Sequence, residues 1–303
     1  MLSSVVALFY YAPGLKYRWL LSVAIELWPY LCIVPVVAFL LAIVLPRWRK
    51  RRIQIGLSTL FLIVSLYPVI TWIGLPNLGS PTGITVMSYN LWFNNPNYDA
   101  IEQSIRNDDP DILFLSEISQ PMMTELVSRL EYSNYYRADG GNNALFSRYP
   151  ILNATTEDFG VSTEGRTFSL VATLQVNDEP VTVIGVHPPV PIFRKFFHVR
   201  NQQLDSFARI SRDIDGKLIL LGDFNATPWS PYFQRFERLS QLDNAGRGQG
   251  IWATWYFNQT PKTRPIKIPI DHIETRGFTA LKTWAGATGG SDHKPVVTVL
   301  RAD

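Results

Sequence analysis

The chain has 303 residues, of which 47% are hydrophobic, and a formal net charge of +3. This length allows one large domain together with a further segment. The only cysteine, Cys32, lies in an apolar run near the N-terminus, which excludes disulfides and a thiolate metal site from the rest of the chain.

The charge is unevenly distributed. Residues 1–76 contain seven of the 28 Lys and Arg residues and one of the 25 Asp and Glu residues, so the remainder carries 21 basic and 24 acidic residues. A protein that binds nucleic acid without regard to sequence usually presents a basic face. The balance therefore disfavours nucleic acid as a partner, although it allows a locally positive cleft.

Two apolar runs near the N-terminus predict a membrane anchor over residues 1–76. The runs at about 28–45 and 55–76 carry no charge, and each could cross a bilayer core of roughly 30 Å at about 1.5 Å per helical residue. We interpret them as two transmembrane helices in a hairpin, which makes the lipid bilayer a partner of this chain.

The loop between these helices, 46–54, is basic and predicts the topology. Loops rich in Lys and Arg are retained on the cytoplasmic side, so both the N-terminus and everything after the second helix should lie on the opposite face. The expected location is the cytoplasmic (inner) membrane, multi-pass, with the large domain periplasmic or extracellular. Residues 1–11 are apolar but short; they fit an interfacial helix, whereas a third crossing would invert this topology.

A linker rich in Pro, Gly and Asn, 77–83, precedes a domain over 84–303 in which strands and helices alternate. This alternation is typical of an α/β fold. Strands are expected at 84–89, 112–116, 143–146, 168–176, 181–186, 217–221, 268–274 and 296–300, and helices at 98–106, 120–130 and 193–214.

Polar residues follow the predicted strands at the points where they end. Asn90 follows the first strand, Glu117 the second, His187 the strand at 181–186, and Asp223 with Asn225 the strand at 217–221. Asp271 lies within the strand at 268–274, and Asp292 and His293 precede the last strand. Ligand sites of α/β sheets gather at strand ends, so we expect these side chains to converge.

Six short motifs in order resemble the endonuclease/exonuclease/phosphatase superfamily, which includes deoxyribonuclease I-like enzymes. The motifs are SYNL (88–91), SEI (116–118), VHPP (186–189), GDFNATP (222–228), IDHI (270–273) and SDHKPV (291–296). Thr227-Pro228-Trp229-Ser230 and the stretch from Gly250 to Trp255 are similar to a bacterial branch with an N-terminal membrane anchor. The resemblance implies an α/β (α+β) fold: a four-layer sandwich of two mixed sheets flanked by helices.

The resemblance also implies a metal site and a catalytic group. Glu117 would be the principal metal ligand, with Asn90 and Asp292 supporting it, and hard oxygen donors favour Mg²⁺ or Mn²⁺. Asp223 would deprotonate the attacking water, and Asn225 and His187 would donate to phosphate oxygens. His293 would contact the phosphate, and Asp271 would orient its ring.

Each of these residues also has a structural interpretation. Gly222-Asp223-Phe224-Asn225 could be a turn in which side chains bond the backbone, and Asn90 could cap a turn. Four carboxylates in one cleft would repel one another, so convergence predicts a divalent cation and imidazolium groups beside them. Arg194, Lys195 and Arg200 could grip an anionic substrate or form a solvated helix face.

The function predicted on this basis is a membrane-anchored, divalent-metal-dependent phosphohydrolase that cleaves a phosphodiester or phosphomonoester by in-line attack of water. A nuclease, a lipid-headgroup phosphodiesterase and a sugar- or inositol-phosphate phosphatase all remain open. The alternative class is a non-catalytic binding or scaffold module on the same fold. A zinc hydrolase using His187 and His293 is disfavoured, because the neighbouring donors are mostly oxygen. The pattern does not address the oligomeric state.

Overall fold

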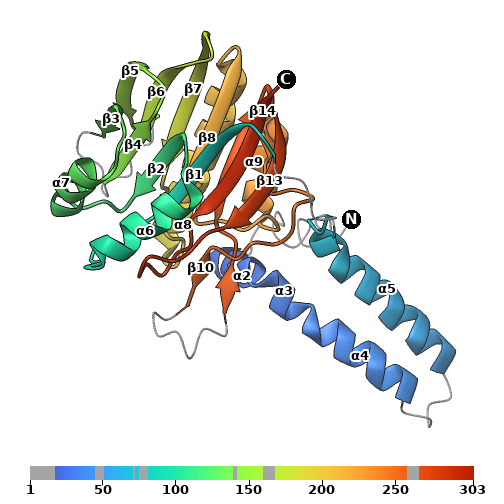
Figure 1. Ribbon diagram of the computed structural model, residues 1–303. Coiled ribbons are helices and arrows are strands. Elements are labelled where there is room, and N and C mark those ends of the chain that lie inside the picture. The colour runs from blue at the N-terminus through green and yellow to red at the C-terminus, as the bar shows by residue number, and fades with distance from the viewer. Residues whose placement is uncertain are drawn as a thin grey trace.

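The structure is a computed structural model that describes residues 18–44, 51–70, 72–74, 81–138, 142–159, 168–257 and 266–303. In Figure 1 two β-sheets are packed together with helices on their outer sides, and a pair of N-terminal helices extends away from them.

Each of the two main sheets has six strands and mixes parallel with antiparallel pairs. The first sheet has the order β13-β14-β1-β2-β4-β3, in which β1 and β2 are parallel. Its strands are β1 (Ile84–Asn90), β2 (Ile112–Ser116), β3 (Asn134–Arg137), β4 (Asn143–Ser147), β13 (Phe278–Ala285) and β14 (Val296–Ala302).

The second sheet has the order β5-β6-β7-β8-β12-β9, in which β7 and β8 are parallel. Its strands are β5 (Ile151–Glu157), β6 (Ser169–Val176), β7 (Glu179–Val186), β8 (Lys217–Asp223), β9 (Asp243–Asn244) and β12 (Asp271–Arg276). A separate two-stranded ribbon is formed by β10 (Trp255–Tyr256) and β11 (Lys267–Ile268).

The core lies between the two sheets because alternate residues of each strand face inward. Val86 of β1 and Phe114 of β2 meet Ile219 and Leu221 of β8 in one buried cluster. The outer face of the first sheet is covered by α6 (Tyr98–Asp108) and α7 (Gln120–Arg129), and that of the second by α8 (Arg194–Asp213) and α9 (Pro231–Ser240). The predicted sandwich of two mixed sheets flanked by helices is therefore confirmed.

Several elements differ from the sequence-based expectation. The predicted strand at 268–274 is two elements, β11 and β12, separated at Pro269, whose nitrogen has no hydrogen to donate to a ladder. Strands β5 and β13 were not predicted because they are partly exposed edge strands without a regular apolar alternation. Helix α9 was also missed, although Pro231 stands in its first turn and Phe233 and Phe236 share its buried face.

The N-terminal region contains α2 (Arg18–Glu26), α3 (Trp28–Leu31), α4 (Ile33–Val44) and α5 (Arg51–Ile70). The predicted helix at 28–45 is broken at Cys32, since Pro35 lacks the N–H that would bond to the carbonyl of Leu31. The second predicted helix, 55–76, instead begins at Arg51 and ends at Ile70. Arginine is a good helix former, which extends the helix into the predicted basic loop.

None of the helices in the described part of the chain is by itself both long and apolar enough to cross a membrane. Trp19–Glu26 and Trp28–Leu41 meet that requirement only as a pair bent by 79°, and the apolar helix Ile55–Ile70 is shorter. Residues 1–11, the loop 46–50 and most of the predicted linker 77–83 lie outside the described residues.

The two sheets approach closely where Gly185 of β7 faces Phe114 of β2. A Cβ atom added at Gly185 would lie 2.1 Å from the Phe114 ring. We therefore expect Gly185→Ala to lower the free energy of unfolding by about 1–3 kcal/mol through overpacking, as measured by urea denaturation of the full chain. Gly56→Ala in α5, where a Cβ meets nothing within 4 Å, is the control and should not be destabilising. Equal stability of the two variants would contradict this packing.

Candidate active site

The candidate site lies at one edge of the sandwich, where β1, β2, β7 and β8 end. The inward-facing positions of β1 and β8 continue to Asn90 and Asp223, so these two side chains meet between the sheets. Asn90 Nδ2 donates to Glu117 Oε1 at 2.9 Å and to Asp223 Oδ2 at 3.1 Å. One carboxamide therefore joins carboxylates that belong to different sheets.

Glu117 stands in a tight turn directly after β2, with φ of 55°. Side chains other than Gly rarely adopt this left-handed conformation, and such strained residues cluster at functional sites. Its carboxylate accepts hydrogen bonds from Asn90 and from the Phe93 backbone N–H at 3.1 Å. Burial would raise the pKa of Glu117, but the charge of His187 and these two hydrogen bonds lower it overall. Glu117 is therefore a partly exposed, ionised carboxylate.

Asp223 and Asp271 lie directly opposite each other on the antiparallel strands β8 and β12. Both are buried. Burial and the charge of Asp271 raise the pKa of Asp223 to about 6, although His293 and His187 oppose the increase. Two adjacent carboxylates that are both buried can be ionised together only if positive charge lies nearby.

His293 supplies that positive charge. Its Nδ1 lies 2.9 Å from Asp271 Oδ2, and its Nε2 lies 3.7 Å from Asp223 Oδ2. Burial alone would lower the pKa of His293, but the charges of Asp271 and Asp223 and the hydrogen bond to Asp271 raise it to about 10. The ring is therefore an imidazolium held between the two carboxylates at neutral pH.

His293 precedes β14 of the first sheet, and Ser291 fixes its position. Ser291 Oγ accepts from the His293 backbone N–H at 2.9 Å and donates to the Asn90 carbonyl at 2.8 Å. Trp255 forms a β-bridge with His293, and its indole N–H donates to Asp292 Oδ2 at 3.2 Å. Sequence reasoning assigned no role to Ser291, although its place in the SDHKPV motif marked it.

The end of β8 and the segment after it contain two unusual backbone conformations. Gly222 has φ of 150°, and a Cβ there would lie 1.9 Å from the Val186 carbonyl oxygen, so only glycine fits. Asn225 has φ of 48°, and its backbone N–H donates to Asp223 Oδ1 at 2.8 Å. Asn225 Nδ2 donates to the Pro188 carbonyl at 3.0 Å. The turn that was considered as the structural interpretation of this motif is present, and it orients the Asp223 carboxylate.

His187 and Asp292 complete the predicted set. His187 Nε2 lies 3.6 Å from Glu117 Oε1 and 3.7 Å from Asp223 Oδ2, so it shares the cleft with both. Asp292 is half-buried and makes a smaller contribution to the raised pKa of His293. Within the described chain its carboxylate accepts from the Trp255 indole N–H, and it does not join the Asn90–Glu117 pair.

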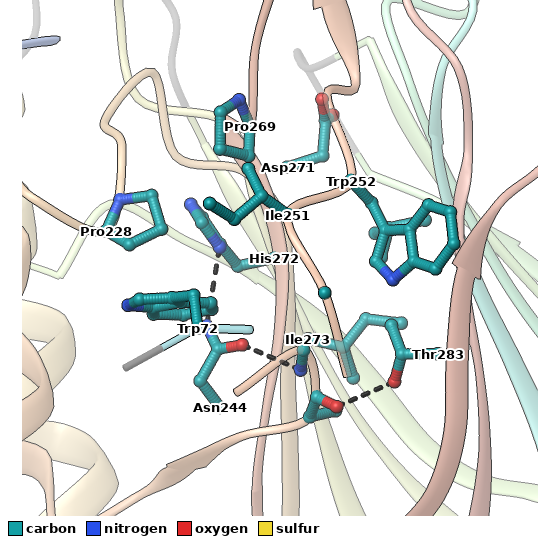
Figure 2. Close-up of a pocket in the computed structure, with 14 residues that line it drawn as sticks. Trp72, Pro228, Asn244, Ile251, Trp252, Pro269, Asp271, His272, Ile273 and Thr283 are labelled. Carbon is teal, nitrogen blue, oxygen red and sulfur yellow. Dashed lines mark hydrogen bonds between the residues drawn. The ribbon is translucent and has the colours of Figure 1, made fainter. Parts of the chain in front are cut away.

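A second group of potential metal ligands differs from the predicted one. Ligand atoms of Asp223, Asp271 and His293 all lie within 4.8 Å of one another. Asp271 Oδ1 has no hydrogen-bond partner in the described chain, and Asp271 also lines a cavity of about 30 Å³ that Trp72 and His272 share (Figure 2). His293 Nδ1 is already hydrogen-bonded to Asp271. We therefore interpret these residues as a histidine oriented by a carboxylate rather than as a metal site.

Two further residues, one inside the IDHI motif and one in the predicted basic helix, lie outside the site. His272 faces the opposite side of β12, where its ring packs 4.2 Å from that of Phe233, and burial lowers its pKa to about 4. Arg200 is fully buried and bonded to Glu26, so it is neither a substrate-gripping residue nor part of a solvated face.

Comparison with known proteins identifies the family. The model of the Endonuclease/Exonuclease/phosphatase family matches residues 87–293, and the chain belongs to this family. A UPF0294 protein of Vibrio campbellii is 27% identical over 122 residues, which is 40% of this chain and 40% of that protein. A UPF0294 protein of Vibrio vulnificus is 31% identical over 98 residues, 32% of this chain and 31% of that protein. The matches thus span well under half of these relatives.

Solved structures share the fold at low sequence identity. TDP2 of D. rerio, solved in complex with a single-strand DNA product, superposes with a TM-score of 0.63 and 16% identity, covering 73% of this chain and 100% of that one. A mutant beta toxin from Staphylococcus aureus with bound magnesium ions gives a TM-score of 0.56 and 16% identity, covering 72% and 99%. An endonuclease/exonuclease/phosphatase family protein from Bacteroides thetaiotaomicron gives 0.60 and 19%, covering 74% and 96%.

The pairing of His293 with Asp271 makes a prediction about titration. We expect the His293 imidazole to titrate near pH 10, so its contribution to stability is complete below about pH 6.5 and is lost as the pH rises through 10. Asp271→Asn removes the main charge and the hydrogen bond that raise this pKa, so the value should fall toward about 6.5. NMR of ¹⁵N-labelled histidine in the full chain measures both. A wild-type His293 that titrates near 6.5 would contradict the geometry.

Proposed function

We propose that this protein is a divalent-metal-dependent phosphohydrolase that cleaves a phosphodiester or phosphomonoester by in-line attack of water, without a covalent intermediate. The observation that carries the proposal is the assembly of Asn90, Glu117, Asp223 and His293 at one edge of the sandwich, where Asn90 touches both carboxylates. Membership of the family supports it.

The donor set fits a hard divalent cation. Glu117 is ionised and partly exposed, and the neighbouring donors are carboxylate and amide oxygens of the kind that Mg²⁺ and Mn²⁺ prefer. We propose that Glu117 holds the cation with support from Asn90 and Asp292. When bound, such a cation supplies positive charge that polarises the phosphoryl oxygens.

Asp223 is the proposed general base. Burial and the charge of Asp271 raise the pKa of the Asp223 carboxyl to about 6. A general base works best when its pKa lies near the working pH, so this carboxylate is suited to take a proton from water. Its orientation is fixed by the Asn90 carboxamide and by the Asn225 backbone N–H. The last position of β8 thus combines basicity with a defined direction.

Three side chains are proposed to bind the phosphate. His293, charged and oriented by Asp271, donates from Nε2 on the side of Asp223, and His187 offers a second imidazole between Glu117 and Asp223. Asn225 would donate to a non-bridging oxygen in exchange for its 3.4 Å hydrogen bond to Asp223 Oδ2. Fixed donors stabilise negative charge on the phosphate in the transition state without reorganising.

Membrane attachment through the N-terminal helices is also part of the proposal. The pair α4–α5 exposes large apolar side chains, which lipid would cover in a bilayer. They include Val34, Leu40, Leu41, Leu57, Leu60, Phe61 and Ile63. With the basic residues between these helices on the cytoplasmic side, the catalytic domain would be periplasmic or extracellular.

The substrate is proposed as a phosphate ester of a membrane or envelope component. Domain acidity disfavours extended nucleic acid, and attachment to a bilayer brings lipid headgroups within reach. The TDP2 structure contains a DNA product, so a nuclease stays among the outcomes to be measured.

Hydrolysis by the full chain in detergent tests the proposal. The panel is bis-p-nitrophenyl phosphate, plasmid DNA, sphingomyelin and inositol phosphates. We expect turnover that EDTA abolishes and Mg²⁺ or Mn²⁺ restores. Asp223→Asn should lower kcat by about 10²- to 10⁴-fold by removing the base, whereas Asp215→Asn, exposed before the start of the same strand, should not. No hydrolysis of any substrate would favour a binding module instead.

The topology can be tested separately. Alkaline phosphatase fused after Asp303 should be active in cells, and green fluorescent protein fused at the same position should be dark, because the C-terminus is proposed to lie outside the cytoplasm. The opposite pair of results would contradict the proposed location and would match a third membrane crossing near the N-terminus.

A further inference from the structure

The carboxylate of Glu26, at the end of α2, is buried inside the catalytic domain. It is the only acidic residue of residues 1–76, and 6% of its surface is exposed. Glu26 Oε2 accepts from the Thr227 backbone N–H at 2.7 Å and from Thr227 Oγ1 at 2.6 Å. Its backbone oxygen accepts from the Trp229 indole N–H at 2.9 Å. Helix α2 is therefore attached to the segment that follows Asp223.

Arg200 of α8 links Glu26 to the same segment a second time. The guanidinium is fully buried, and its Nη1 donates to Glu26 Oε1 at 3.0 Å and to the Asn225 carbonyl at 2.7 Å. Its Nε donates to Asn201 Oδ1 at 3.0 Å. A buried charge pair of this kind persists only when further hydrogen bonds satisfy it, and here backbone groups of the catalytic segment supply them.

These contacts fix backbone that regular secondary structure does not hold. Asn225 and Thr227 lie beyond the end of β8, and Asn225 is in the left-handed conformation that directs its N–H to Asp223. Arg200 holds the carbonyl of Asn225, and Glu26 holds the N–H of Thr227. The orientation of the proposed base thus depends on a residue of the N-terminal region.

The other end of the N-terminal helices is attached to the same side of the domain. Trp72, just beyond α5, is buried, and its carbonyl accepts from the Gly250 N–H at 3.0 Å. The Arg247 guanidinium lies 4.8 Å from its ring centre. Figure 2 shows Trp72 beside His272, next to Asp271 in the chain. The N-terminal helices are therefore attached at one end to the segment after Asp223 and at the other to the cavity that Asp271 and His272 line.

We propose that Glu26 is a positioning residue for the hydrolysis: through Arg200 and Thr227 it holds Asp223 and Asn225 in their working orientation. This inference rests on the proposed function for its catalytic consequence. It makes the N-terminal helix part of the catalytic unit, so a domain that begins after the predicted linker would lack a component of its own site.

The first test compares kcat of the full chain and of Glu26→Gln in detergent with bis-p-nitrophenyl phosphate. The amide cannot provide all the acceptor contacts of the carboxylate, so kcat should fall about 10- to 100-fold through misplacement of the base. KM should change less, because Glu26 does not touch the cleft.

Glu131→Gln, whose side chain is 88% exposed, is the matched control and should retain wild-type kcat. Glu26→Asp, which keeps the charge, should recover part of the loss.

A second variant covers the case in which Glu26→Gln fails to fold with Arg200 left unpaired. Thr227→Val removes one hydroxyl donor to Glu26 and keeps the side-chain shape, so it should fold and show a smaller loss of kcat. Hydrogen exchange followed by mass spectrometry gives a readout without substrate. The peptide that covers residues 222–229 should exchange faster in the variants, with the β1 and β2 peptides unchanged.

The outcomes separate this inference from the proposed function. A wild-type chain that hydrolyses nothing contradicts the function, and the exchange comparison still decides whether Glu26 fixes the segment. Folded Glu26→Gln or Thr227→Val with wild-type kcat and wild-type exchange at 222–229 would overturn the positioning role. Faster exchange across the whole domain would also overturn it, because Glu26 would then serve general stability.

Discussion

The site depends on two buried carboxylates placed face to face. Asp223 and Asp271 are directly paired on adjacent strands, and like charges in that position destabilise a sheet. His293 relieves the repulsion, since its charged ring contacts Asp271 and faces Asp223. Because His293 precedes a strand of the other sheet, the charge balance can exist only when both sheets are packed together. Assembly of the site therefore requires that the two sheets are packed together.

The same constraint explains the polar connections around the pair. Asn90 reaches from the first sheet to Asp223 of the second, and Ser291 ties the His293 backbone to that of Asn90. The backbone that follows Asp223 belongs to no helix or strand, and its polar groups are bonded by Arg200 and Glu26 instead. The Asp223 carboxylate thus keeps a raised pKa and a fixed direction, while Glu117 at the rim stays ionised and partly exposed.

The sequence predicted those features that follow from local pattern. The positions at the strand ends predicted that Asn90, Glu117, His187 and Asp223 converge, and the structure brings these side chains together. Contacts between distant segments were not predictable in this way. Nothing local to Glu26 or Arg200 indicates that they pair across 174 positions, and an isolated arginine on a helix is usually solvated. The edge strands β5 and β13 were missed because partial exposure removes the apolar alternation.

Attack of water on phosphorus is the central claim, and isotope labelling measures it most directly. Bis-p-nitrophenyl phosphate would be hydrolysed by the full chain in H₂¹⁸O with Mg²⁺ or Mn²⁺, and the products examined by mass spectrometry. The account predicts one ¹⁸O atom in the p-nitrophenyl phosphate and none in the p-nitrophenol, at a rate that Asp223→Asn reduces strongly. Label in the p-nitrophenol, or hydrolysis that continues unchanged in Asp223→Asn, would contradict it.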